Sequence, residues 1–204
     1  MTTRIVKTKR TLTRTNDYEF YAIREAAIGY VANGVIIAPL KPRSKHFSKI
    51  YDLRRRITTI KDAIYYWDLY PASNIAAPTS KKNNNWIIFD IDVKNGINGV
   101  ESIIKIIESN GLKLPSTSVV RSGSGGYHCY YRNVKDSTVS SSNGKRLGID
   151  IRSELAYVVL PPSVHHNGTQ YQWIIGDVQS ISNANDDVYR LVDIVNRINN
   201  EKYW

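Results

Sequence analysis

The stretch from Asn85 to Asp92 constrains the fold more than any other part of the chain. The residues Trp-Ile-Ile-Phe lead into Asp90-Ile91-Asp92, with an asparagine cluster before the run and Gly96 after it. A short, β-branched and aromatic run between such residues predicts a buried strand. Because successive side chains of a strand point to opposite faces, Asp90 and Asp92 should share one face, with Ile91 buried behind them.

Two carboxylates crowded at the end of a buried strand repel each other and are hard to desolvate. A divalent cation is a hard ion that prefers oxygen ligands, and placed between the carboxylates it would offset this cost. The pair therefore predicts a metal site. The alternative is a strand-end pair that only caps the turn at Asn95-Gly96.

Length and charge limit the class of protein. A chain of 204 residues can form one large domain or two small subdomains. Its 28 Lys and Arg against 18 Asp and Glu give a net charge of +10, which favours a polyanionic partner such as nucleic acid. The single cysteine, Cys129, excludes an internal disulfide and a cysteine-based zinc cluster. No apolar run could span a bilayer, so we expect an intracellular (cytoplasmic) protein with no membrane partner.

Two basic segments stand in the N-terminal part. Residues 1–15 form either a basic arm that contacts phosphate or a solvated, flexible terminus. The segment from Lys41 to Lys61 holds eight Lys or Arg and one acid, and its triplet Arg54, Arg55 and Arg56 could contact nucleic-acid phosphates. A solvated charged face is the alternative. The expected elements are a helix over 16–32, a strand over 35–38 ended by Pro39, a helix from Thr59 to Pro71 and a strand over 74–78.

The C-terminal part alternates strand and turn signals. We expect a helix from Asn98, strands over 117–121, 127–132, 148–152, 156–160 and 170–175, and a last helix capped by Ser182. The polar, serine-rich connection over 133–145 is expected to be mobile. Links of the hairpin type between successive strands predict an antiparallel sheet with helices on one face, and hence an α+β fold.

A third strand acid, Asp150, lies between Ile149 and Ile151, which must point into the core. Three such acids commonly hold two hard cations that neutralise a triphosphate and activate the attacking oxygen. Taken alone, Asp150 could instead be a surface acid paired with Arg152 or Lys145.

A glycine- and serine-rich turn lies between these acids in the sequence. Its residues Ser122, Ser124, Gly125 and Gly126 could cradle phosphate oxygens with their backbone N–H groups, and His128 on the following strand could donate to a phosphate. A hairpin needs similar residues for its turn alone. The chain has no Gly-x-x-x-x-Gly-Lys-Ser/Thr motif, which excludes a P-loop ATPase.

Taken together, these motifs resemble a known family. The apolar run before Asp90-x-Asp92, Ser-Gly-Gly-x-His128, and Gly-Ile-Asp150-Ile-Arg followed by Val-Val-Leu-Pro-Pro-Ser-x-His-x-x-Gly-x-x-Tyr-x-Trp resemble the primase–polymerase (prim-pol) domain of the archaeo-eukaryotic primase superfamily. That group includes bifunctional replication proteins of plasmids and viruses. The similarity covers about Gly34 to Trp173.

The resemblance implies an N-terminal α/β module (16–84) packed on an RRM-like module (85–204), with the active cleft between them. It implies template-directed nucleotidyl transfer with Mg²⁺ or Mn²⁺ and no zinc, and with single-stranded DNA and nucleotide triphosphates as partners. A helicase or initiation domain is a possible further partner. By motif, Asp90, Asp92 and Asp150 match the catalytic metal ligands and His128 the nucleotide-phosphate contact.

Further nucleotide contacts are expected from Lys45, Arg152, Ser163 and His165. The chain departs from the family in one place, because Gly126 stands where relatives often have serine two residues before the histidine. Two other functions remain open on the sequence alone. The same acids could serve a metal-dependent nuclease, or the sheet could belong to a non-catalytic single-strand binder or replication initiator.

Overall fold

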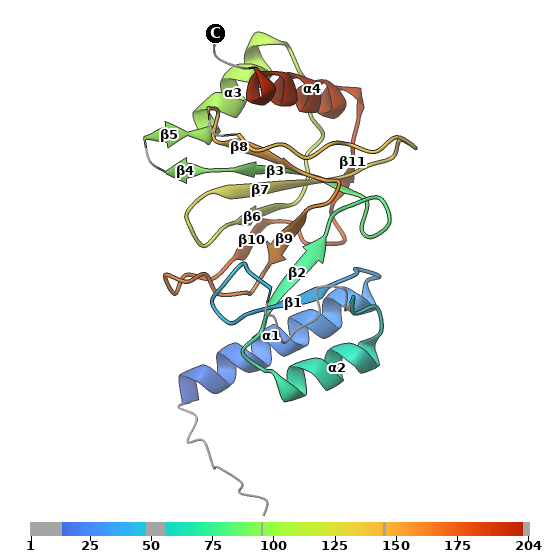
Figure 1. Cartoon of the computed structure of the whole chain (residues 1–204), viewed down its shortest axis with the longest axis vertical. Coiled ribbons are helices and arrows are strands. Elements are labelled where there is room, and N and C mark those ends of the chain that lie inside the picture. The colour runs from blue at the N-terminus through green and yellow to red at the C-terminus, as the bar shows by residue number, and fades with distance from the viewer. Residues whose placement is uncertain (1–13, 48–55, 95, 145, 202–204) are drawn as a thin grey trace, which may run out of the picture.

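The computed structural model describes residues 14–47, 56–94, 96–144 and 146–201, and it has the expected α+β fold (Figure 1). The helices are α1 Arg14–Ala32, α2 Ile60–Leu69, α3 Gly99–Ser109 and α4 Asp186–Asn200. The strands are β1 Ala38–Leu40, β2 Asn74–Pro78, β3 Trp86–Ile91, β4 Val93–Lys94, β5 Ile97–Asn98, β6 Val119–Arg121, β7 Tyr127–Arg132, β8 Ile149–Arg152, β9 Tyr157–Leu160, β10 Gln172–Ile175 and β11 Ser182–Asn183. No helix in these ranges is both long and apolar enough to cross a membrane.

The larger sheet is built around β3, as the sequence predicted. Its order is β10-β6-β7-β3-β8, and these neighbours are all antiparallel, while the short β11 pairs with β7 in parallel. One face of β3, with Ile87, Phe89 and Ile91, packs in the core under α3 and α4. The other face, with Trp86 and Ile88, packs toward the N-terminal part of the chain.

The smaller sheet has the order β1-β2-β9. Strand β9 follows β8 closely in the sequence, yet it pairs with β2 and not with β8. The predicted division at residue 84 assigns β9 to the second module, but after β8 the chain returns to the smaller sheet, whose other strands belong to the first module. Figure 1 shows the resulting layers: α3 and α4, the larger sheet, the smaller sheet, and then α1 and α2.

Side chains of α1 and β10 tie the N-terminal layer to the larger sheet. The hydroxyl of Tyr30 donates to the carbonyl oxygen of Pro161 at 2.7 Å and accepts the indole N–H of Trp173 at 3.0 Å. Tyr30 is 6% exposed and belongs to a hydrophobic core to which residues of both sheets contribute. The contacts between the two halves are therefore apolar burial fixed by a directional polar link.

Two of the element boundaries that differ from expectation have a clear physical reason. The first strand contains Pro39, which was expected to end it. Because β1 is the edge of its sheet, a residue without an N–H is tolerated there. The last helix begins after Asn185, whose side chain accepts the N–H of Val188 at 3.0 Å, while Ser182 belongs to β11. Asn185 precedes two acids in the first turn and is the N-cap that the sequence pattern missed.

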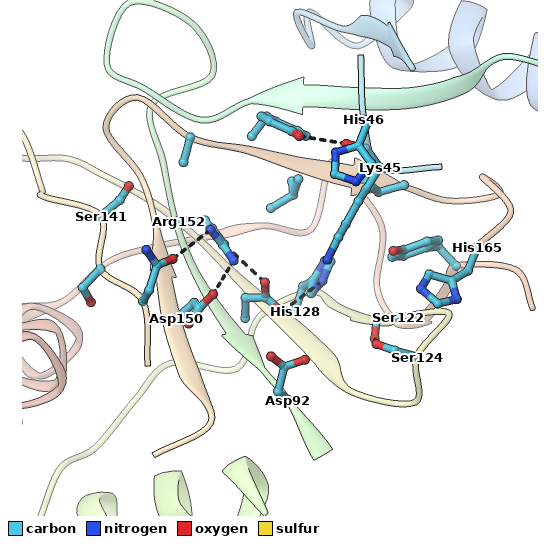
Figure 2. A pocket seen from close by; sticks show the side chains of 18 of the residues that line it. Lys45, His46, Asp92, Ser122, Ser124, His128, Ser141, Asp150, Arg152 and His165 are labelled. Atoms are coloured by element: carbon cyan, nitrogen blue, oxygen red, sulfur yellow. Dashed lines mark hydrogen bonds and ion pairs between the residues drawn. The ribbon is translucent and has the colours of Figure 1, made fainter. Parts of the chain in front are cut away.

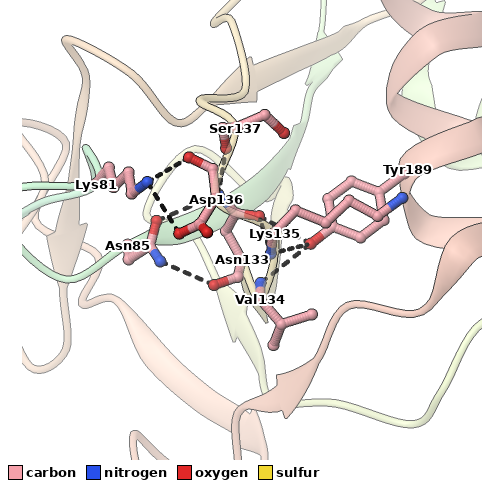
Figure 3. Close-up of polar contacts among 8 residues, drawn as sticks. All are labelled: Lys81, Asn85, Asn133, Val134, Lys135, Asp136, Ser137 and Tyr189. Atoms are coloured by element: carbon pink, nitrogen blue, oxygen red, sulfur yellow. Dashed lines mark hydrogen bonds and ion pairs between the residues drawn. The ribbon is translucent and has the colours of Figure 1, made fainter.

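The connection after β7 is fixed by hydrogen bonds at its start (Figure 3). Asn133 is 6% exposed, and its side chain donates to Ser137 O at 3.0 Å and accepts the hydroxyl of Tyr189 on α4 at 2.8 Å. The same hydroxyl accepts the N–H groups of Val134 and Lys135 at 3.0 and 3.2 Å. The segment expected to be mobile is thus bonded to α4 where it leaves the sheet.

Candidate active site

Three polar residues lie in one row across the larger sheet. Asp90 on β3 is the register partner of His128 on β7 and also of Asp150 on β8. Residues directly opposite each other on paired strands project from the same face, so all three side chains leave the sheet on one side. This is the side that faces β9. Two of the three predicted acids are therefore adjacent, with the predicted histidine beside them.

The third acid, Asp92, is placed by backbone contacts just beyond β3. Its N–H donates to Gly148 O at 2.7 Å, and its carbonyl oxygen accepts the N–H of Gly99, the first residue of α3, at 2.9 Å. A Cβ on Gly99 would lie 2.3 Å from Gly148 O, so only glycine permits this close approach. Asp92 has the same side-chain direction as Asp90, as the i, i+2 spacing predicted.

The acids of the row contact the guanidinium of Arg152 and the imidazole of His128 (Figure 2). The guanidinium of Arg152 contacts Asp90 Oδ2 through Nε at 3.3 Å and contacts Asp150 Oδ2 through Nη2. Nε2 of His128 lies 3.4 Å from Asp90 Oδ1. Asp150 also accepts the backbone N–H of Gly144.

These contacts act on the ionisation of the acids in different ways. Burial disfavours the charged form of Asp90, but the charges and hydrogen bonds of His128 and Arg152 outweigh it and lower the pKa of Asp90 to about 2. Burial raises the pKa of Asp150, and repulsion from Asp90 and Asp92 raises it further. The hydrogen bond from Gly144 and the charge of Arg152 lower this pKa, but the net shift is upward. The three carboxylates therefore influence one another electrostatically.

The row forms part of the wall of a pocket of about 680 Å³. The pocket is lined from the larger sheet by the three acids, His128 and Arg152, and from β9 by Tyr157, Val158 and Val159. Both sheets thus contribute residues to the pocket wall. Nine residues predicted for the site line this one pocket: Lys45, Asp90, Asp92, Ser122, Ser124, His128, Asp150, Arg152 and His165.

The turn between β6 and β7 closes one end of the pocket. Within it, the N–H groups of Ser122 and Gly125 donate to Gly126 O at 2.8 Å and to Ser122 O at 3.0 Å, and the hydroxyls of Ser122 and Ser124 lie 3.0 Å apart. Gly123 O accepts the Asn167 amide at 2.9 Å, which joins the turn to the hairpin that carries His165. The N–H groups of Ser122 and Gly125 are thus used inside the turn, whereas Ser122 and Ser124 line the pocket.

Lys45 and His46 enter the pocket from the segment before the first gap in the described chain (Figure 2). Tyr157 on β9 holds this segment, because its hydroxyl donates to Lys45 O at 2.8 Å and its ring packs edge-on against Phe47 at 4.6 Å. The lysine side chain is exposed. Its ammonium group is therefore available to an anion in the pocket.

Some predicted contacts lie elsewhere. Ser163 is fully buried, and its hydroxyl accepts the N–H of Ile75 on β2 at 2.8 Å, so it serves the smaller sheet and is not part of the pocket wall. Gly125 and Gly126 shape the turn without lining the pocket. Arg56 is exposed outside it, and Arg54 and Arg55, like residues 1–13 of the basic arm, lie outside the described residues.

The sequence reasoning missed several wall residues. Tyr171 lies within the C-terminal motif but was given no role; its ring is 6.0 Å from that of His128, and burial raises its pKa to about 12. Asn143 comes from the serine-rich connection, which Ser142 anchors to Ile151 by two backbone hydrogen bonds of 3.0 Å. Leu155 also lines the pocket; it is 95% exposed, and its backbone φ of 55° lies in the left-handed region. Only Tyr171 carried a usable signal, its place in the motif.

The donor chemistry of the site fits a hard cation. Three carboxylates from adjacent strand positions face one pocket, and oxygen is the ligand that Mg²⁺ and Mn²⁺ prefer. As the side chains stand, Arg152 bridges two of these acids. In this arrangement of side chains, the part of the chain that the structure describes contains no group of three or more His, Cys, Asp or Glu placed so that it could hold a metal ion.

Fold and site together define a class of protein, an α+β domain with acids, a histidine and cationic side chains around one pocket between two sheets. The chain belongs to the Prim-Pol family, described as "Bifunctional DNA primase/polymerase, N-terminal", whose model matches residues 27–187, more than half of the chain. A search of curated proteins finds no match. The family resemblance in the motifs is therefore confirmed, and membership supports a DNA primase/polymerase function of the nucleotidyltransferase type in general terms.

Proposed function

We propose that the chain is the catalytic domain of a DNA primase/polymerase that performs template-directed nucleotidyl transfer from nucleotide triphosphates in plasmid or viral replication. The single observation that carries this proposal is the convergence of Asp90, Asp92, Asp150 and His128 on one pocket in a Prim-Pol chain. The serine hydroxyls of the β6–β7 turn and the exposed Lys45 add anion-binding groups to the same pocket.

In this proposal Asp90, Asp92 and Asp150 would hold two divalent cations, Mg²⁺ or Mn²⁺. When bound, such cations lower the pKa of the attacking 3′-hydroxyl and neutralise the charge that develops on the phosphates. His128 and Lys45 bind and orient the triphosphate. The apolar β9 wall, with Val158 and Val159, limits access of water to the pocket.

Unprimed synthesis is the direct test. Single-stranded DNA, labelled nucleotide triphosphates and Mn²⁺ or Mg²⁺ should give labelled oligonucleotides, and Asp92→Asn should reduce their yield by at least about a hundredfold. DNA binding by this variant should stay unchanged or become tighter, because a negative charge is removed. Asp193→Asn, the same chemical change on the exposed face of α4, is the matched control and should keep full activity.

A primer added to the same reaction separates initiation from extension. Extension without initiation would mean a polymerase that needs a helicase or initiation domain to start. Silence in both reactions, with DNA binding retained, would overturn the enzyme in favour of a single-strand binder. Shortening of the DNA without nucleotide triphosphates would indicate a nuclease.

A further inference from the structure

Arg152 occupies the space between two of the three acids. The register explains how: Arg152 and Asp150 are two residues apart on β8 and share a face, and Asp90 lies directly opposite Asp150. The guanidinium therefore reaches both carboxylates at once, with Nε 3.3 Å from Asp90 Oδ2 and Nη2 bonded to Asp150 Oδ2. Figure 2 shows the contact between Arg152 and Asp150.

The surroundings orient the guanidinium without enclosing it. Its remaining nitrogen, Nη1, contacts Asn143 Oδ1 at 3.4 Å, a long and weak hydrogen bond. The arginine side chain is 32% exposed, whereas the side chains of Asp90 and Asp150 are 21% and 14% exposed. The acids are thus the more buried partners, and the cation lies on the pocket side, where it can leave without unfolding the strand.

We infer that Arg152 is a built-in counter-ion of the acid row, which a divalent cation must displace in order to bind. A guanidinium and a hard cation compete for the same carboxylate oxygens, so the two cannot use Asp90 and Asp150 together. The inference rests on the proposed function for its next step. A triphosphate entering the pocket offers the displaced guanidinium a bidentate partner, so nucleotide and metal should favour each other's binding.

Lys45 allows an effect of net charge on metal binding to be distinguished from occupation of the carboxylate ligands. It is a cation of the same charge and lines the same pocket, but within the described residues no ion pair joins it to an acid of the row. If Arg152 acted only through net charge, removal of either cation would strengthen metal binding to a similar extent. If it acts by occupying the ligands, only its own removal should do so.

The test is calorimetric titration of the full chain with Mn²⁺ alone. Arg152→Gln should bind Mn²⁺ at least about tenfold more tightly than the native protein, and Lys45→Gln should change the affinity by less than about threefold. No gain in Arg152→Gln, or an equal gain in Lys45→Gln, overturns the inference. Thermal unfolding of each variant checks that it is folded.

A second measurement uses the native protein and does not depend on the variants. The Nε–H resonance of Arg152 in a ¹⁵N spectrum should shift when Mg²⁺ binds, because Nε loses Asp90. Saturation with Mg²⁺ without this shift overturns the inference. If the native chain synthesises DNA but Arg152→Gln binds Mn²⁺ no more tightly, the inference about Arg152 is wrong and the proposed function is still supported. If Arg152→Gln binds Mn²⁺ more tightly but the native chain synthesises no DNA, the inference about Arg152 is supported and the proposed function is wrong.

Discussion

At the scale of single residues, Gly126 shows how closely the turn approaches the acids. A Cβ at this position would lie 2.3 Å from Ile91 O and 3.4 Å from Asp92 Cα. The first distance is shorter than any that a real Cβ normally makes to a backbone oxygen. The serine that relatives often carry here has no room in this chain. The hydroxyls of Ser122 and Ser124, which line the pocket, take its place as candidate phosphate donors.

Gly126→Ser should therefore destabilise the protein, since either the turn or the end of β3 must move. We expect a loss of about 1–3 kcal/mol in the free energy of unfolding, measured by urea denaturation. Gly29→Ala is the control, because a Cβ at Gly29 in α1 meets nothing within 4 Å. That change should stabilise by up to about 1 kcal/mol through helix propensity. Equal stability of the Gly126→Ser variant and the native chain would contradict the predicted clash.

At the scale of elements, α4 fixes the start of the β7–β8 connection through the hydroxyl of Tyr189. Tyr189→Phe keeps the ring, over which the Lys135 ammonium lies at 4.0 Å, and removes only the hydroxyl. Asn133, Val134 and Lys135 then lose a hydrogen-bond partner (Figure 3). We expect a loss of about 1–2 kcal/mol in the free energy of unfolding.

Tyr65→Phe is the control for this prediction, since Tyr65 on α2 is 58% exposed and should be neutral to within about 0.5 kcal/mol. Hydrogen exchange should localise the change to residues 133–137. The Mn²⁺ affinity should be unchanged, because Tyr189 does not line the pocket. A drop in metal affinity would mean that the connection transmits its position to Asp150, contrary to this prediction.

Elements with a local signal could be predicted from the sequence. The apolar run before Asp90 identified β3, and strand alternation placed Asp90 and Asp92 on one face without any knowledge of the partners. The path of β9 could not be predicted in this way. Its apolar residues suit either sheet, and the choice of β2 over β8 depends on long-range packing that no local pattern records.

The same limit applies to the site. The order of motifs brought His128 and Asp150 together with Asp90, and the register confirms their adjacency. Sequence spacing gave no sign that Ser163 hydrogen-bonds β2, because the two residues are 88 positions apart in the chain. It gave no sign that Asn143 reaches the pocket, because Asn143 belongs to a polar connection without a strand or helix pattern. Arg152 was predicted to contact nucleotide, with a pair to Asp150 as the alternative. The structure contains the pair with Asp150 and adds a contact to Asp90 that the sequence did not indicate.

At the scale of the whole molecule, the net charge of +10 coexists with a pocket lined by three acids. Lys45 and Arg152 also line this pocket, so most of the 28 Lys and Arg lie outside it. Lys41, Arg43 and Arg56 are exposed, and they belong to the basic segment from Lys41 to Lys61. We propose that this segment contacts template phosphates while the acids contact the metal.

Neutralising Lys41, Arg43 and Arg56 together to Gln should weaken binding to single-stranded DNA and make it less sensitive to salt. Removing one cation that binds a phosphate should reduce the slope of log affinity against log salt concentration by roughly 0.7. A slope that is lower by about 2 in fluorescence anisotropy titrations would mean that all three side chains bind phosphate. Mn²⁺ affinity should be unaffected, because none of the three residues lines the pocket.

The matched control removes the same charge from the other side of the molecule. Lys105 on α3, Lys113 after it and Arg197 on α4 are exposed on the helical layer that covers the opposite face of the larger sheet. If DNA follows the basic segment, neutralising these three should leave the salt slope nearly unchanged, since they do not bind phosphate. If both triple variants show the same decrease in slope, the DNA responds to net charge alone, and the assignment of the template to the Lys41–Lys61 segment is wrong.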